Sequence, residues 1–233
     1  MDNNSSPQQT VLARESPQVV SELPTLGGII AALQAKGDYY GLIQAAERAD
    51  LVAHDDHLTR LLIAVPLVLS YLIVNDLPSA KFALLRIPDA VASVPLAQAT
   101  LKLFASVWER RYENIFSRGE ALSNLARRAD HLQEDLAELI AGLVGTFIES
   151  FRQRTFVLVS KAYTTIPLSL AQVYLGLQSD HLLRVTSSEG WHFDAPSQIL
   201  TPVRIARGTE PSPASSTLLM FEGVTDNVAR LET

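Results

Sequence analysis

The sequence predicts a mostly helical fold: a stack of degenerate helical hairpins, followed by a winged helix with a small β wing. Apolar residues recur every three or four positions through most of the chain, which is the period of a helix that buries one face. The spacing changes to two residues only after Gly190, and two is the period of a strand. Short helices that bury their faces against neighbouring helices are typical of helical repeats, although no repeat consensus is present.

The composition excludes several classes of protein. With 47% hydrophobic residues, the 233-residue chain can bury a substantial core. Its net charge of -6 is a poor match for the phosphates of nucleic acids. The absence of cysteine excludes disulfides, zinc-thiolate sites and a cysteine nucleophile, and it suits a reducing compartment.

The first part of the chain is expected to be helical throughout. Residues 1–24 are rich in Ser, Pro, Gln and Asn and predict a disordered tail. Residues 25–146 form the predicted helical repeat region, with no strand expected between Thr25 and Leu143. The expected helices cover residues 26–35, 39–49, 61–74, 79–86, a segment through 101–108 and a segment through 132–143.

Residues 61–74 form the most apolar of these helices. The run is only 14 residues long and contains Pro66, whereas a membrane span needs about 20 apolar residues. We therefore expect a helix that is buried on all sides, capped by Asp55 or Asp56 and ended at Asn75-Asp76.

The next helices are punctuated by prolines. Pro78 is expected in the first turn of the helix 79–86, and Pro88 and Pro95 are expected to bracket a loop. Trp108 is in helical register with Leu101 and Phe104, so it is expected in the core.

Residues 147–208 are predicted to form the winged helix. A helix through Phe156 and Ile166 is expected to stop before Pro167, and Ser169 and Ser179 are expected to cap the next two helices. The first of these carries an apolar stripe that is expected to be buried core, formed by Leu170, Val173, Tyr174 and Leu177. Strands are expected only between Trp191 and Ala206, and residues 209–233 predict a linker and a short helix.

The charge of this module argues against DNA binding. Between Ala162 and Thr233 there are four basic and seven acidic residues, so the net charge is 4 - 7 = -3. Binding to a duplex requires clustered positive charge. We therefore expect no nucleic-acid partner.

Potential metal ligands crowd together in one place only, His54-Asp55-Asp56-His57. Two histidines at this spacing could share a helix face, so a metal-dependent hydrolase is an alternative function. A third histidine or cysteine is missing nearby, which favours a solvated loop that caps the following helix. Motifs of the P-loop, dinucleotide and nucleophile-elbow types are also missing from the sequence.

Several segments resemble a known family. The strings RTFVLVSKAYTTI (residues 154–166) and LAQVYLGLQSDHLLRVTSSEGW (170–191) closely resemble the PCI-type domain of the subunit 8 family of the COP9 signalosome. LPSAKFALLRIP (77–88) and VWERRYENIF (107–116) resemble that family upstream, in the same order. Proteasome-lid and translation-initiation-factor subunits share this architecture but match less well.

The resemblance implies a non-catalytic scaffold without cofactors, located in the cytoplasm and nucleus. The signalosome removes a ubiquitin-like modifier from cullins through a zinc isopeptidase subunit with a His-x-His motif, which this sequence lacks. The implied partners are other signalosome subunits, most directly subunit 3, and a shared C-terminal helix bundle. A subunit of the proteasome lid or of an initiation factor remains the alternative.

The candidate partner-binding residues lie in the wing and at the C-terminal end: Ile199, Thr201, Val203, Ile205, Val228 and Leu231. A wing that ends in residues 199–205 is expected to leave an unpaired strand edge, which a neighbouring chain could cover by strand addition. Pro202 lacks a donor and limits this pairing. The alternative is that Arg207 to Ser216 folds back over the same edge.

The sequence predicts that the purified chain binds no stoichiometric zinc and cleaves no isopeptide bond, because it lacks His-x-His and cysteine. Elemental analysis of purified protein and an isopeptidase assay test this. One tightly held zinc ion per chain would overturn the expectation.

Overall fold

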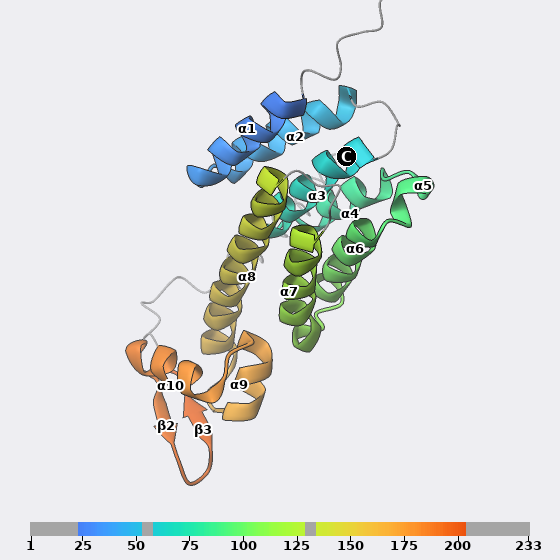
Figure 1. The fold of residues 1–233 in the computed structure, drawn as a ribbon. Coiled ribbons are helices and arrows are strands. Elements are labelled where there is room, and N and C mark those ends of the chain that lie inside the picture. The colour runs from blue at the N-terminus through green and yellow to red at the C-terminus, as the bar shows by residue number, and fades with distance from the viewer. Residues whose placement is uncertain (1–22, 53–57, 129–133, 204–233) are drawn as a thin grey trace, which may run out of the picture. The chain divides into compact units, whose positions relative to one another are not determined.

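The chain divides into two units, and the described residues of the first, Met1–Arg152, contain the starts of eight helices (Figure 1). The computed structural model describes residues 23–52, 58–128 and 134–203. The helices are α1 (Leu23–Ala35), α2 (Tyr39–Val52), α3 (Leu58–Ile73), α4 (Leu77–Leu85), α5 (Asp89–Ala92), α6 (Pro95–Trp108), α7 (Tyr112–Arg128) and α8 (Glu134–Ala162). The last of these crosses into the second unit, Gln153–Thr233.

The mostly helical prediction is confirmed, and the described part of residues 25–143 contains no strand. Three details differ from the expectation. The loop expected between Pro88 and Pro95 contains the short helix α5, and α8 is one continuous helix where two patterns were expected. No helix was predicted over α7. The predicted tail, the cap at Asp55 or Asp56 and the last helix lie mainly or entirely outside the described residues.

Helix α3 lies at the centre of the first unit. Nearly all of its described side chains are buried, from Arg60 to Ile73, and α2, α4, α5 and α6 all pack against it. Pro66 has no N–H to donate, yet the helix continues through it, and the Ser70 hydroxyl donates to the Pro66 carbonyl at 2.7 Å. None of the described helices has the length and apolarity that crossing a bilayer requires.

Residues between α3 and α4 end the first helix and start the second. Asn75 has a φ of 64°, a left-handed conformation that ends α3, as expected. A carboxylate oxygen of Asp76 then accepts a hydrogen bond from the Ser79 N–H at 3.1 Å, and Pro78 lies in the first turn of α4. The caps thus place α4 directly against α3.

Charged side chains of α2 form ion pairs and a hydrogen bond with residues of α3 and the end of α4. The buried carboxylate of Asp50 lies 3.3 Å from the Arg60 Nε and 2.8 Å from the Arg86 Nε. One turn earlier, Glu47 accepts a hydrogen bond from the Tyr71 hydroxyl, and burial together with this bond raises the pKa of Tyr71. A buried carboxylate needs such partners because it has lost its water.

Helix α7 approaches α8 closely at a glycine. A Cβ placed on Gly119 would lie 2.9 Å from the Ile148 Cδ1, so a larger residue there would require the Ile148 side chain to shift. Aromatic rings continue the contact, with centroids of Phe116 and Phe151 6.1 Å apart. The buried positions of α7 are Ile115, Gly119, Leu122 and Ala126.

The prediction that Trp108 is core is wrong. Its side chain is 47% exposed, whereas Phe104, one turn earlier, is buried beneath it. The two ring centroids are 5.7 Å apart. The buried face of α6 is centred on Leu103 and Val107, and Leu101 and Trp108 lie at its exposed margin.

Replacing Asp50 by alanine is expected to destabilise the first unit by about 3 kcal/mol, because it removes the carboxylate that two guanidinium groups share in a buried site. Urea unfolding followed by circular dichroism measures the change. Glu149→Ala is the matched control, since it removes an ion pair with Arg152 in which the carboxylate is largely exposed, and we expect a loss below about 0.5 kcal/mol. Equal losses in the two variants would show that the Asp50 contacts do not stabilise the fold.

Candidate partner-binding surface

The second unit is built on the end of α8. It contains β1 (Ile166–Pro167), α9 (Leu168–Leu175), α10 (Ser179–Ser188), β2 (His192–Asp194) and β3 (Ile199–Thr201). The buried side chains of its core come from the end of α8, β1, α9, α10 and β3, together with Trp191, and Phe193 of β2 packs against them: Val159, Ile166, Leu168, Ala171, Leu175, Leu182, Trp191 and Leu200. Trp191 stacks on Phe156 of α8, with ring centroids 4.8 Å apart.

The buried face of α9 differs from the predicted stripe. Leu168, Ala171 and Leu175 are fully or almost fully buried, whereas Val173 is 41% exposed. The other predicted residues, Leu170, Tyr174 and Leu177, are only partly buried. Ala171 lies on the buried side of the helix, and α9 contacts both α10 and β1.

The predicted caps of the two helices are also corrected. Pro167 is the N-cap of α9, two residues before the expected cap Ser169. Gln178 is the N-cap of α10, so the expected cap Ser179 is the first helical residue. Between them, Gly176 ends α9 with a φ of 60°. This left-handed turn suits glycine and lets α10 fold back on α9.

The sheet has three strands in the order β1-β3-β2, and both pairings are antiparallel. Strands were expected only between Trp191 and Ala206, so β1 is a correction. It arises because α8 ends at Ala162 and the chain then extends, which pairs Ile166 with Leu200. The pairing buries both side chains in the core.

This topology overturns the expectation of a free edge at β3. The strand lies between β1 and β2, so Ile199 and Thr201 belong to the middle of the sheet. Ile199 is partly buried, Thr201 is exposed, and Val203, just beyond the strand, is half exposed. Ile205, Val228 and Leu231 lie outside the described residues, as does the segment 207–216.

The open edge of the described sheet is β2. The Leu168 N–H donates to the Gln198 carbonyl at 2.9 Å, so by antiparallel alternation the peptide groups of Leu200 point toward β1. The peptide groups of Ile199 and Thr201, on either side of Leu200, then point toward β2, where they face Asp194 and His192. The N–H and C=O of Phe193, between these two residues, therefore point outward.

The opposite edge is blocked. The same alternation turns the backbone of Pro167 outward from β1, and proline has no N–H to offer. Among the described strands, only β2 presents both a donor and an acceptor to an incoming strand.

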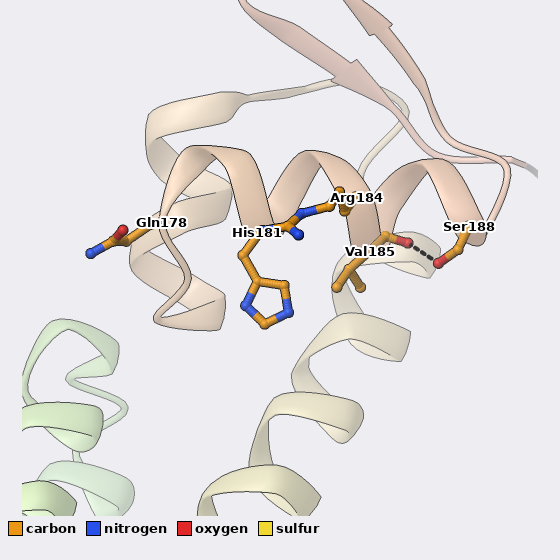
Figure 2. A pocket seen from close by; sticks show the side chains of 5 residues that line it. All are labelled: Gln178, His181, Arg184, Val185 and Ser188. Carbon is orange, nitrogen blue, oxygen red and sulfur yellow. Dashed lines mark hydrogen bonds between the residues drawn. The ribbon is translucent and has the colours of Figure 1, made fainter.

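The outer face of α10 carries a shallow hollow, lined by Gln178, His181, Arg184, Val185 and Ser188 (Figure 2). The Arg184 guanidinium donates back to the Asp180 carbonyl at 3.2 Å. The described residues 153–203 contain three basic and three acidic side chains, which leaves no net charge. This helix face therefore lacks the clustered cations that bind a phosphate backbone.

The described residues hold no cluster of three or more His, Asp or Glu side chains that could ligate a metal. His54 and His57 lie outside the described residues. Burial lowers the pKa of the Arg154 guanidinium. The described part of the second unit presents one open strand edge, at β2, and exposed helix faces.

Comparison with known proteins places these features in a family context. A model of the CSN8/PSMD8/EIF3K family matches residues 59–209, which is more than half of the chain. A protein from Dictyostelium discoideum named COP9 signalosome complex subunit 8 is 28% identical over 189 residues, covering 80% of this chain and 89% of the relative. Proteins of the same name from Arabidopsis thaliana and Danio rerio are 29% and 27% identical, each over 71% of this chain.

Leu175→Asp is expected to unfold the second unit, because it places a carboxylate in a fully buried site at a cost of several kcal/mol. Hydrogen exchange of the amides in residues 153–203 measures the loss of protection. Val173→Asp, on the exposed side of the same helix, serves as the control and should leave exchange unchanged. If both variants exchanged alike, the assignment of the buried face would be wrong.

Proposed function

The chain belongs to the CSN8/PSMD8/EIF3K family, and we propose that it is a non-catalytic scaffold subunit of the COP9 signalosome, the complex that removes a ubiquitin-like modifier from cullins. One observation carries the proposal: relatives from a slime mould, a plant and a fish, all named COP9 signalosome complex subunit 8, align with at least 71% of this chain. The family description also includes the second candidate, a subunit of the proteasome lid or of a translation initiation factor.

A scaffold role agrees with the chemistry of the chain. The sequence offers no His-x-His motif and no cysteine, and its described residues contain no metal-ligating cluster. What the structure does offer is apolar helix surface and a strand edge, and both serve association with other chains. In this proposal the zinc isopeptidase activity resides in another subunit.

In the same proposal the second unit is a winged helix and the first a set of helical hairpins. The order β1-α9-α10-β2-β3 after the end of α8 supports the winged helix, with β2 and β3 as the wing. Contacts between consecutive helices, α1 with α2, α3 with α4 and α6 with α7, support the hairpins. Acting in the cytoplasm and nucleus, such a subunit would extend the complex without contributing to its chemistry.

The edge of β2 is the proposed joint to a neighbouring subunit, most directly subunit 3. Its outward N–H and C=O at Phe193 allow strand addition, and the partly buried phenyl ring anchors the edge on the core. The C-terminal segment that contains Val228 and Leu231 is proposed to join a helix bundle shared by the subunits. The two contacts are separate and can be tested separately.

Purification of the tagged full-length chain from its own cells tests the proposed function. We expect the other signalosome subunits to co-purify in stoichiometric amounts and the purified complex to cleave modified cullin. Recovery of proteasome-lid or initiation-factor subunits in their place would overturn the proposal in favour of the second candidate.

Phe193→Pro should weaken binding to recombinant subunit 3 by about tenfold or more, because proline removes the outward N–H while leaving the β2–β3 bonds of His192 and Asp194 in place. Surface plasmon resonance measures the affinity. Phe193→Ala loses the same ring but keeps the N–H, so it separates the strand contact from the loss of packing. Equal affinities for the two variants would exclude strand addition at β2.

A further inference from the structure

Helices α4 and α6 of the first unit expose an unusual amount of large apolar side chain. Phe82 and Leu85 on α4 are 61% and 69% exposed, and Leu101 and Trp108 on α6 are 52% and 47% exposed. The two helices pack against one another beside α3 (Figure 1). Single exposed apolar residues are ordinary on protein surfaces, whereas a contiguous set marks an interaction site.

One contact joins the exposed sides of the two helices, and helical spacing relates the remaining exposed side chains to it. The Lys81 Nζ lies 5.2 Å from the centre of the Trp108 ring, which joins the two helices at that point. Leu85 follows Lys81 by one turn of α4, and Leu101 precedes Trp108 by two turns of α6. We call this surface the α4–α6 face: Phe82, Leu85, Leu101 and Trp108, with Lys81 among them.

The fold does not require these residues to be apolar. The helix faces that pack inward are already supplied by other residues, such as Ala83 on α4 and Leu103 on α6, both buried. Exposed tryptophan and phenylalanine are enriched at the centres of protein interfaces, where they supply most of the binding energy. The α4–α6 face has that composition.

The charge around the face is opposite to that of the whole chain. Between Leu77 and Trp108 the basic residues are Lys81, Arg86 and Lys102 and the acidic one is Asp89, so the local charge is 3 - 1 = +2, in a chain of net charge -6. Arg86 is engaged with Asp50. Lys81 and Lys102 are exposed beside the apolar side chains, where they complement a partner with acidic flanks.

We infer that the α4–α6 face docks an acidic amphipathic helix of another protein, whose apolar stripe covers Phe82, Leu85, Leu101 and Trp108 while its carboxylates meet Lys81 and Lys102. A second copy of the chain fits less well, because a two-fold contact would bring the same lysines together. A membrane surface fits less well, because its recognition uses clusters of four to eight cations. This surface lies outside the proposed strand joint, and the inference does not depend on which complex the chain enters.

Isothermal titration of the full-length chain with a synthetic peptide tests the inference. The probe is a helical peptide of about 18 residues with leucine along one face and glutamate on both flanks, long enough for five turns. We expect a dissociation constant in the micromolar range for this peptide. A peptide with lysine in place of the glutamates should bind with an affinity about tenfold lower. Lys81→Glu should reverse the preference between the two peptides.

Matched variants locate the site. Phe82→Glu and Leu85→Glu should each weaken binding of the acidic peptide by about tenfold or more, and both should keep the parent's thermal unfolding curve because the positions are exposed. Tyr40→Glu replaces an aromatic residue of α2 that is 70% exposed, and it should leave the affinity unchanged. Having two independent variants protects the test against a folding defect in either one.

Five results would overturn the inference. The first is no binding of the acidic peptide up to about 1 mM, a concentration that corresponds to about 4 kcal/mol of binding free energy. The second is equal weakening of binding by Tyr40→Glu. The third is conversion of a dimer to a monomer by Phe82→Glu in sedimentation, which would assign the face to a second copy. The fourth is binding to phosphatidylserine vesicles that Phe82→Glu abolishes, which would assign the face to a membrane. Faster hydrogen exchange of residues 204–233 in Phe82→Glu would likewise assign the face to the chain's own end and overturn the inference.

Discussion

The requirement that α3 be covered on every side governs the first unit. Its apolar residues leave no face that can meet water, so helices from before and after it in the sequence must pack around it. This constraint explains the polar contacts as well. Asp50 and Arg60 are drawn into a buried environment by the packing of α2 on α3, and there they form an ion pair. Hydrophobic burial thus comes first, and the pairing of charges follows from it.

A second constraint acts in the second unit, where a sheet of very short strands has to be held by side chains. Two or three residues per strand provide few backbone hydrogen bonds, so the sheet depends on the core formed by Ile166, Leu200 and Trp191. The proline in β1 and the outward peptide of Phe193 in β2 give the two edges different capacities. The strand order determines which edge can accept another chain. The packing of the core side chains determines whether that edge is rigid enough to accept it.

Periodicity predicted the helices and the change to strands after Gly190, because a helix that buries one face has to repeat its apolar residues. It did not predict α7, whose buried face uses Gly119 and Ala126, small residues that carry little hydrophobic signal. It also missed β1, since a two-residue strand has no period and is defined only by its distant partner Leu200. The free edge was therefore assigned to the wrong strand. Trp108 was misplaced for a related reason: spacing identifies a shared face, but only the packing of α6 shows which margin of it stays exposed.

The chain's two tryptophans fall in different units and in opposite environments, which makes them natural optical reporters. Trp108 is half exposed in the first unit, and Trp191 is buried against Phe156 in the second. A soluble quencher such as iodide reaches the indole of Trp108 far more readily than that of Trp191, so their emission can be separated without any label. Intrinsic fluorescence can then reveal whether the two units melt in one transition or in two, which is the question that decides whether a single unfolding free energy describes the whole chain.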